Sequence, residues 1–246
     1  MPTQHGYSNI VLVDDSHKLV LLASAKCGST SVLRMFYASR GNTEALRQSW
    51  PHAYRVSRWG ADIARFEEAK GVYTQIKFVR NPYFRMVSAY FSCLSNDDWL
   101  EYYPADHPFH RMVRARDSIS FEGFLHFLEH EACDKHVDHC DYQLAKDEEV
   151  DIVVKIEDIH SELAKINSEF GTTYKYESYF HHRKKVPRSG VYRGNVAHSQ
   201  LPCGDRTAFH DLLNKETCAT IVRIYERDFL AYGYSFQLPD SGMNFT

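Results

Sequence analysis

No stretch of this chain is apolar for long enough to cross a lipid bilayer, which takes about 20 consecutive apolar residues. Residues 1–16, MPTQHGYSNIVLVDDS, also lack the basic stretch and long apolar stretch of a secretory signal. We therefore expect either a cytoplasmic protein or the soluble part of a membrane-anchored enzyme.

The chain also lacks a strong excess of either charge and a compact set of cysteines. Its formal net charge is −3, with 29 Lys and Arg against 32 Asp and Glu, which argues against a protein that coats nucleic acid. The six cysteines are scattered over 246 residues, so we predict reduced thiols rather than a disulfide framework. Hydrophobic content of 43% suits a globular protein, and residues 1–246 are predicted to form a single domain.

A strand, a loop of small residues and a helix are predicted in succession over residues 18–36. Residues 19–23 are apolar, as in a strand buried on both faces, and Val32 and Phe36 recur at helical spacing. The intervening loop reads Ala25-Lys26-Cys27-Gly28-Ser29-Thr30-Ser31. Such a loop suits a phosphate, because a glycine lets the backbone approach, helix N–H groups point at the anion and a lysine adds charge. An ordinary strand–helix turn capped by Ser or Thr is the alternative interpretation.

The loop lacks the Walker A pattern of ATP and GTP hydrolases. That pattern, G-x-x-x-x-G-K-[ST], places its lysine after the second glycine, whereas Lys26 precedes the single glycine here. A nucleotide hydrolase is therefore disfavoured, and a P-loop-like ATP-dependent kinase is kept as an alternative function.

A second anion-binding corner is predicted where a buried strand over residues 72–79 ends at Arg80. Asn81-Pro82 breaks this strand, and a proline suits the first turn of a helix. Arg80, Arg85 and Ser88 flank the strand end and the first helical turns.

These two segments resemble the nucleotide-binding motifs of sulfotransferases that use 3′-phosphoadenosine 5′-phosphosulfate (PAPS), in particular the carbohydrate-type family 2 group. Residues 26–31 resemble the 5′-phosphosulfate loop, and residues 80–90 resemble the 3′-phosphate motif R-[DN]-P-x-x-R-x-x-S-x-Y. Residues 150–159 are similar to a strand that ends in an acidic pair, and residues 224–234, IYERDFLAYGY, to the signature Y-x-x-D-F-x-x-[FY]-G-Y. The four stretches follow one another in the family's order.

The resemblance implies a three-layer α/β fold, with a mostly parallel central sheet and a P-loop-like strand–loop–helix. It also implies transfer of a sulfuryl group from PAPS to a hydroxyl, on a carbohydrate or glycoconjugate, with 3′-phosphoadenosine 5′-phosphate as the product. Lys26 would stabilise the leaving phosphate. The residues assigned to PAPS binding are Lys26, Cys27, Gly28, Ser29, Thr30, Ser31, Arg80, Ser88 and Arg188. No metal is required by this scheme, and the acceptor and oligomeric state stay open.

The base that takes the acceptor's proton is predicted to be a histidine. Relatives carry an H-x-x-P-Q-like segment before the strand over residues 152–156, and Gln143 matches its end. His136 lies seven residues before Gln143 and His139 lies four before it, so both are candidates, with Glu157 next. Solvated loop histidines and a zinc site are the alternatives. The zinc ligands would be Cys133, His136, His139 and Cys140.

Two further stretches have open roles. Residues 181–193 are basic, and Arg188 is assigned to PAPS because a late basic loop closes over the nucleotide in relatives; an acidic acceptor, or no ligand, is the alternative. An aromatic stretch over residues 95–117 either forms an acceptor platform or packs a satellite core. Its side chains include Trp99, Tyr102, Tyr103, Phe109 and His110. A nucleotide- or glycan-binding module without catalysis is the non-enzyme alternative.

The remaining elements are predicted from periodicity and from turn or capping residues. They are a hairpin over residues 9–14 and 18–24 with its second strand central, an irregular stretch over 41–57, a short helix over 61–70, a helix capped by Ser120, a helix over 159–170 ended by Gly171, and a long helix over 205–225.

Overall fold

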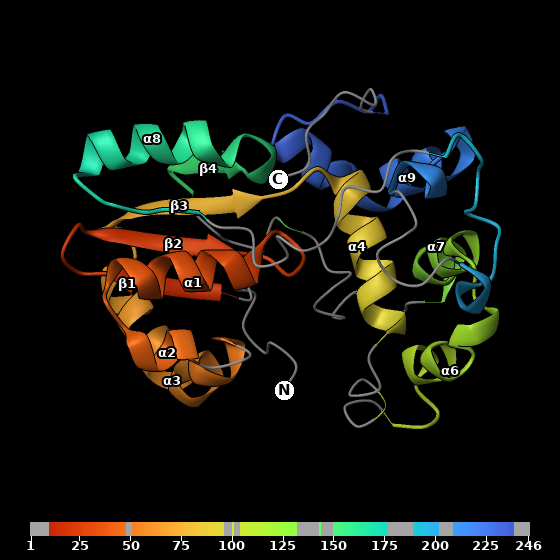
Figure 1. Ribbon diagram of the computed structural model, residues 1–246, viewed down its shortest axis with the longest axis horizontal. Coiled ribbons are helices and arrows are strands. Elements are labelled where there is room, and N and C mark those ends of the chain that lie inside the picture. The colour runs from red at the N-terminus through yellow and green to blue at the C-terminus, as the bar shows by residue number, and fades with distance from the viewer. Residues whose placement is uncertain are drawn as a thin grey trace. The chain divides into compact units, whose positions relative to one another are not determined.

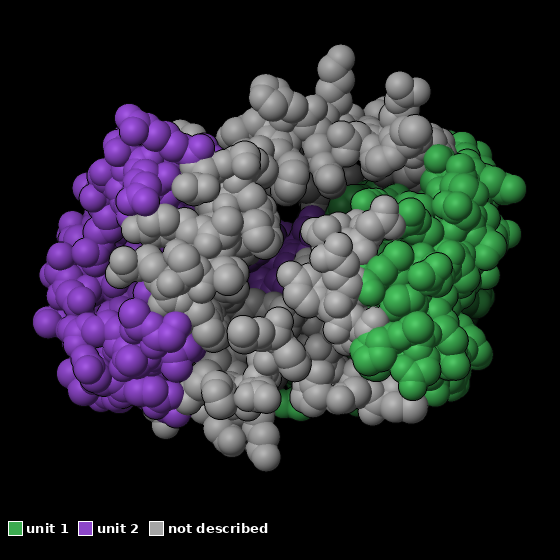
Figure 2. Space-filling model, turned by 90° about the horizontal axis from the view of Figure 1, so that it is seen from below, with its two compact units in different colours: residues 1–4, 81–142, 182–243 green, residues 5–80, 143–181, 244–246 purple. Residues whose placement is uncertain are grey.

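The computed structural model describes residues 10–47, 51–95, 100, 104–131, 143, 150–176, 189–201 and 209–238, without the side chains of 51–59. Two compact units divide the chain (Figure 2). Residues 5–80, 143–181 and 244–246 make up the sheet unit, and residues 1–4, 81–142 and 182–243 make up the helical unit. The chain is α/β, as predicted; a single domain over residues 1–246 stays a prediction.

A four-stranded sheet in the order β1-β2-β3-β4 forms the centre of the sheet unit (Figure 1). Its strands are β1 (Ile10–Asp14), β2 (Leu19–Ala23), β3 (Thr74–Val79) and β4 (Ile152–Lys155). β1 is antiparallel to β2, while β2, β3 and β4 are parallel neighbours. The predicted hairpin with a central second strand and the mostly parallel sheet are confirmed.

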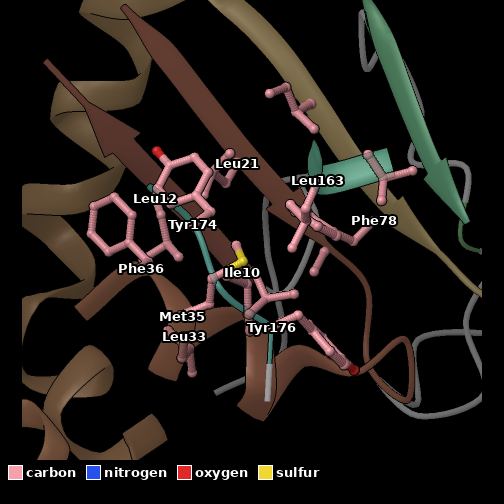
Figure 3. Packing of buried hydrophobic residues seen from close by; sticks show 14 of the residues in the cluster. Ile10, Leu12, Leu21, Leu33, Met35, Phe36, Phe78, Leu163, Tyr174 and Tyr176 are labelled. Atoms are coloured by element: carbon pink, nitrogen blue, oxygen red, sulfur yellow. The ribbon is translucent and has the colours of Figure 1, made fainter. Parts of the chain in front are cut away.

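Helices cover both faces of the sheet, because successive residues of a strand point to opposite faces. Leu19, Leu21 and Ala23 of β2 belong to a core with α1 (Ser29–Ser39) and α8 (Ile159–Phe170), part of which Figure 3 shows. Val20 and Leu22 belong to a second core with α3 (Pro51–Ala69). The short helix α2 (Thr43–Arg47) joins the first core. Helices, sheet and helices give the three predicted layers.

The helical unit is built around α4 (Pro82–Leu94), whose side chains are almost all buried. The other helices of this unit with described bounds are α6 (Pro108–Arg114), α7 (Phe121–His130) and α9 (Lys215–Ala231). Short 3-10 helices are η1 (Arg116–Ser118), η3 (His198–Gln200) and η4 (Phe209–Leu212), and η2 (Ile156–Asp158) lies in the sheet unit. Tyr90 of α4 meets the ring edges of Phe121 and Phe124 in α7, which ties these helices together.

Two predictions about residues 41–79 are wrong. The stretch over 41–57 is not irregular: it contains α2 and the start of α3, since Pro51 occupies a first helical turn, where proline is tolerated. The predicted short helix over 61–70 is the end of α3. Val72 was expected in a buried strand but is 74% exposed. β3 begins at Thr74 because Thr74 is opposite Leu19, the first residue of β2.

The long helix predicted over residues 205–225 has other bounds. α9 starts at Lys215 because Asn214 caps it: its side chain accepts a hydrogen bond from the Thr217 N–H at 2.8 Å. The helix then continues to Ala231 past a kink at Tyr225. The predicted caps elsewhere are confirmed, since Ser120 accepts from the Gly123 N–H at 3.1 Å and Gly171, with φ 68°, ends α8.

Two observations concern the cysteines and the absence of long apolar stretches noted in the sequence. Cys27, Cys93 and Cys218, the cysteines in the described ranges, carry free thiols. Among the helices that the structure describes, none is both long and apolar enough to cross a membrane.

Candidate functional site

The loop between β2 and α1 is a tight turn followed directly by a helix N-terminus. The Cys27 N–H donates to the Ser24 carbonyl at 3.2 Å, and Lys26, the third residue of this turn, has φ 66°. A positive φ at that position is typical of a type II turn, but it is uncommon for a lysine. Residues held in such a conformation concentrate at functional sites, so Lys26 marks this loop as a candidate.

Gly28 is the N-cap of α1, with φ 71° and no side-chain cap. Ser29, Thr30 and Ser31 therefore occupy the first helical turn and do not cap the helix. The first N–H groups of an α-helix have no acceptor one turn earlier, and they carry the positive end of the helix dipole. The first turn of α1 contains no acidic residue. The loop thus combines a helix N-terminus, hydroxyl side chains and a half-buried lysine, which are the kinds of group that bind anions.

Strand β3 brings Arg80 to the same edge of the sheet. Ala23 is opposite Phe78 in parallel register, so β2 and β3 end side by side. The half-buried Arg80 side chain donates from Nη1 to the Lys26 carbonyl at 3.3 Å. The structure therefore brings together two predicted site residues that are 54 positions apart in the sequence.

A fully buried glutamine, Gln143, bonds to both strand ends. Its Oε1 accepts from the Arg80 N–H at 2.7 Å and from the Cys27 thiol at 2.9 Å, and its Nε2 donates to the Arg80 carbonyl at 2.8 Å. The Ser24 hydroxyl donates to the Gln143 carbonyl at 3.1 Å. Both donors of Cys27 are thus engaged within the protein, so the contact of Cys27 with a nucleotide stays a prediction.

The sequence analysis missed Tyr176, which is 8% exposed and lies in the extended segment after α8. Its hydroxyl is 2.5 Å from the position that a Cβ on Gly28 would occupy. Burial raises the pKa of Tyr176, while a hydrogen bond with Ser31 and the charge of Arg80 oppose the rise. Tyr174 and Tyr176 are both buried and are separated by the exposed Lys175. This alternation of aromatic and polar residues is the sequence signal for a segment with one face packed on the core.

Glu157 also lies at this edge, in η2. Because β4 is parallel to β3, with Lys155 opposite Val79, both strands end on the same side of the sheet. Burial is the main cause of the raised pKa of Tyr176, and the charges of Cys27 and then of the half-buried Glu157 contribute less in the same direction.

The rest of the second motif lies in the helical unit and is mostly buried. Arg85 is 1% exposed, and its guanidinium carbon is 6.0 Å from the ring centroid of Tyr225 in α9. The Tyr90 hydroxyl donates to the Ile119 carbonyl at 3.1 Å, and burial raises the pKa of Tyr90. Arg85 and Tyr90 are therefore buried in the packing around α4, whereas Ser88 keeps exposed surface.

Several predicted residues lie outside the described ranges, so the structure does not test the choice of base or the zinc alternative. These residues are His136, His139, Arg188, Cys133, Cys140, Trp99, Tyr102 and Tyr103. Of the aromatic stretch, Phe109 and His110 are described. They are 1% and 5% exposed in α6, which favours the satellite-core interpretation for these two.

Comparison with known families gives one match. A model described as "Sulfotransferase family" matches residues 9–235, nearly the whole chain. Neither the curated proteins nor the solved structures gave a match. The matched range includes the loop before α1 and the ends of β3 and β4, so it covers every part of the candidate site described above.

Proposed function

This chain belongs to the sulfotransferase family, and from that premise we propose that it moves a sulfuryl group from PAPS to a hydroxyl of a carbohydrate or glycoconjugate. The family supports sulfuryl transfer in general, and the donor and acceptor are our proposal. The observation that supports it best is the meeting of Lys26 and Arg80 at one sheet edge, beside a helix N-terminus.

Lys26 would stabilise the transition state. Sulfuryl transfer resembles phosphoryl transfer, in which the bond to the leaving group is largely broken while attack is still weak. Negative charge therefore grows on the oxygen that bridges the leaving phosphate to sulfur. An ammonium group and helix N–H groups beside that oxygen bind the transition state more strongly than the ground state, which raises kcat.

Arg80 and Ser88 would bind the 3′-phosphate of the nucleotide, and Arg188 is proposed to close over it. A guanidinium group forms paired, charge-assisted hydrogen bonds with phosphate oxygens, which favours 3′-phosphorylated nucleotides over adenosine 5′-phosphate (AMP). The bond from Arg80 to the Lys26 carbonyl supports a shared role, because it couples this arginine to the loop assigned to the 5′-phosphosulfate.

The acceptor hydroxyl would attack sulfur while a base removes its proton. We propose His136 or His139 as that base and Glu157 as the next candidate. The new bond joins the acceptor oxygen to sulfur, the bond from sulfur to the bridging oxygen breaks, and its electron pair leaves with 3′-phosphoadenosine 5′-phosphate. Replacing the base by Ala should lower kcat by about 10²–10⁴-fold with little change in PAPS affinity.

The proposal is tested by incubating the protein with sulfur-labelled PAPS and a panel of desulfated glycans, glycolipids and small alcohols. We expect label on at least one saccharide class and at least a ~10²-fold lower rate for Lys26→Met. A parallel reaction with labelled ATP tests the kinase alternative. Tight binding of 3′-phosphoadenosine 5′-phosphate without transfer to any acceptor would identify a binding module and overturn the proposed activity.

A further inference from the structure

The side chain of Gln143 bonds to two parts of the site that come from distant parts of the chain. It forms its hydrogen bonds with Arg80 across 63 residues and with Cys27 across 116 residues. We propose that Gln143 is a positioning residue for nucleotide binding, which holds the Arg80 backbone and the turn containing Lys26 in one arrangement. This inference rests on the proposed function, because it concerns the same PAPS site.

The bonds to Arg80 extend β3 beyond its ladder. The last pairs of that ladder are Ala23 with Phe78 and Val79 with Lys155, so Arg80 follows the last paired residue. A primary amide presents an acceptor and a donor in one plane, as a neighbouring strand would. With 2.7 Å to the Arg80 N–H and 2.8 Å to its carbonyl, Gln143 provides both. Both the N–H and the carbonyl of Arg80 are thereby fixed, which orients the backbone from which its side chain projects.

The remaining bonds hold the turn before α1. Its first residue, Ser24, donates to the Gln143 carbonyl, and its last, Cys27, donates to Oε1. These two residues also close the turn through their own backbone hydrogen bond. Lys26 lies between them in a left-handed conformation that costs free energy, so outside contacts are needed to keep it there. One buried residue thus positions both cations assigned to the nucleotide.

Few side chains can replace this amide. Glutamate has the same length and can accept from the Arg80 N–H, but its carboxylate cannot donate to the Arg80 carbonyl. It would also add negative charge beside the proposed phosphates. Methionine has a similar length and forms none of the three side-chain bonds, while the backbone carbonyl that accepts from Ser24 stays. Both substitutions should therefore release Arg80 while filling most of the space of the glutamine.

The test measures how strongly the protein prefers 3′-phosphoadenosine 5′-phosphate to AMP, by titration calorimetry with each ligand. We expect Gln143→Met to reduce this preference about tenfold or more, since misplacing a positioned group by about 1 Å can cost about 10²-fold. Arg80→Ala should reduce it as well. If Gln143 acts through Arg80, adding Gln143→Met to Arg80→Ala should cause little further loss.

Gln75→Met is the matched control. Gln75 is a second buried glutamine of the sheet unit, 2% exposed in β3, and its Oε1 has no hydrogen-bond partner among the described residues. The substitution is chemically the same, but it lies towards the opposite end of β3. We expect it to leave the preference for the 3′-phosphate unchanged.

The outcomes separate this inference from the proposed function. If the unmodified protein shows no preference for 3′-phosphoadenosine 5′-phosphate, the proposed donor is wrong. The inference is overturned if that preference exists and Gln143→Met keeps it. It is also overturned if Gln143→Met weakens the binding of both ligands equally while the melting temperature falls, because Gln143 would then be merely structural. Should Gln143→Met fail to fold, the same two titrations on Gln143→Asn take its place, because this shorter amide stays neutral but withdraws from the Arg80 backbone: a reduced preference supports the inference and an unchanged preference overturns it.

Discussion

A lysine in a left-handed backbone conformation lies near each end of strand β2. The polar groups around these two lysines differ: a buried carboxylate lies near the first end, and a neutral amide lies at the second. At the first end Lys18, with φ 57°, donates to the Tyr73 hydroxyl at 3.0 Å. Nearby, the buried carboxylate of Asp14 accepts from Tyr174 at 2.6 Å and from Arg40 at 2.6 Å. At the second end the group that joins the strands is the neutral amide of Gln143.

The two ends of β2 differ in the source of the anion that their cations would bind. At the first end it is a carboxylate of the protein, and at the second we propose that it is a ligand. At the first end the protein supplies the anion itself, with Asp14 1% exposed and bonded on both oxygens. The second end has half-buried cations, Lys26 and Arg80, and a helix N-terminus around a neutral centre. Its carboxylates are Glu157, which is half-buried like the two cations, and Asp158, which is exposed. Similar backbone geometry thus accompanies a buried internal carboxylate at one end and half-buried cations beside a helix N-terminus at the other.

The largest expected effect is on catalysis and comes from the second end. Lys26→Met should lower kcat at least ~10²-fold, the loss expected for one preorganised donor to a developing oxyanion. Lys18→Met, the same substitution in the same backbone conformation, should leave kcat unchanged. Steady-state kinetics and direct PAPS binding for both variants provide the measurement. If Lys26→Met raised KM alone, this lysine would be only a binding charge.

The next effect is on stability and comes from the first end. Asp14→Asn keeps the shape but places an NH₂ group against the donor of either Tyr174 or Arg40, which bond to different oxygens, so we expect a loss of about 1–3 kcal/mol in the free energy of unfolding. Asp15→Asn is the control, because the Asp15 side chain is 50% exposed and should contribute at most about 1 kcal/mol. Urea unfolding measures both variants. Equal losses would show that burial does not distinguish the two carboxylates.

A smaller effect concerns the pH dependence of the same carboxylate. Burial alone would raise the pKa of Asp14, but hydrogen bonds from Tyr174 and His17 and the charge of Arg40 together lower it below its ordinary value of 3.8. The unfolded chain therefore takes up this proton first on acidification. The stabilisation by Asp14 is complete above pH 3.8 and is lost as pH falls through the lower folded pKa.

The measurement is urea unfolding of the unmodified protein and of Asp14→Asn from roughly pH 5 downwards. The difference in stability between them should be constant at first and then shrink on further acidification. A difference that grew as the pH fell would mean that the folded state raises the pKa of Asp14, and the assigned network would be wrong.

Local patterns in the sequence were enough to predict the sheet and the loop. An apolar pentapeptide predicted β2, a proline after Arg80 marked the end of β3, and Ser120 and Gly171 marked helix ends correctly. Each of these signals lies within a few residues of the feature it predicts. The predicted start of β3 at Val72 was wrong because the start of this strand depends on its neighbour. The ladder with β2 begins at Thr74, and the sequence around Val72 carries no information about that pairing.

The connections within the candidate site could not be predicted in this way. Gln143 bonds to residues 63 to 119 positions away, and no sequence spacing indicates such a contact. The motif in α4 shows the reverse problem. Its Arg85 and Ser88 are both polar and one helical turn apart, yet one is buried against Tyr225 and the other keeps exposed surface. Residue type alone does not show which of the two side chains is buried.

The smallest expected effect is a coupling at the second end, between Gly28 and Tyr176. Gly28→Ala should destabilise the protein for two reasons: alanine at φ 71° costs about 1–2 kcal/mol, and its Cβ would be 2.5 Å from the Tyr176 hydroxyl oxygen. Tyr176→Phe removes that oxygen and leaves a 3.5 Å contact, so the double variant should recover about 1 kcal/mol relative to additivity.

Tyr174→Phe is the control, because the Tyr174 hydroxyl donates to Asp14 at the first end. Its effect on stability should therefore add independently to that of Gly28→Ala. Unfolding free energies of the single and double variants give both couplings. Strict additivity for Tyr176 would show that its hydroxyl does not restrict the loop, and a coupling to Tyr174 would show that the two ends of β2 are not independent.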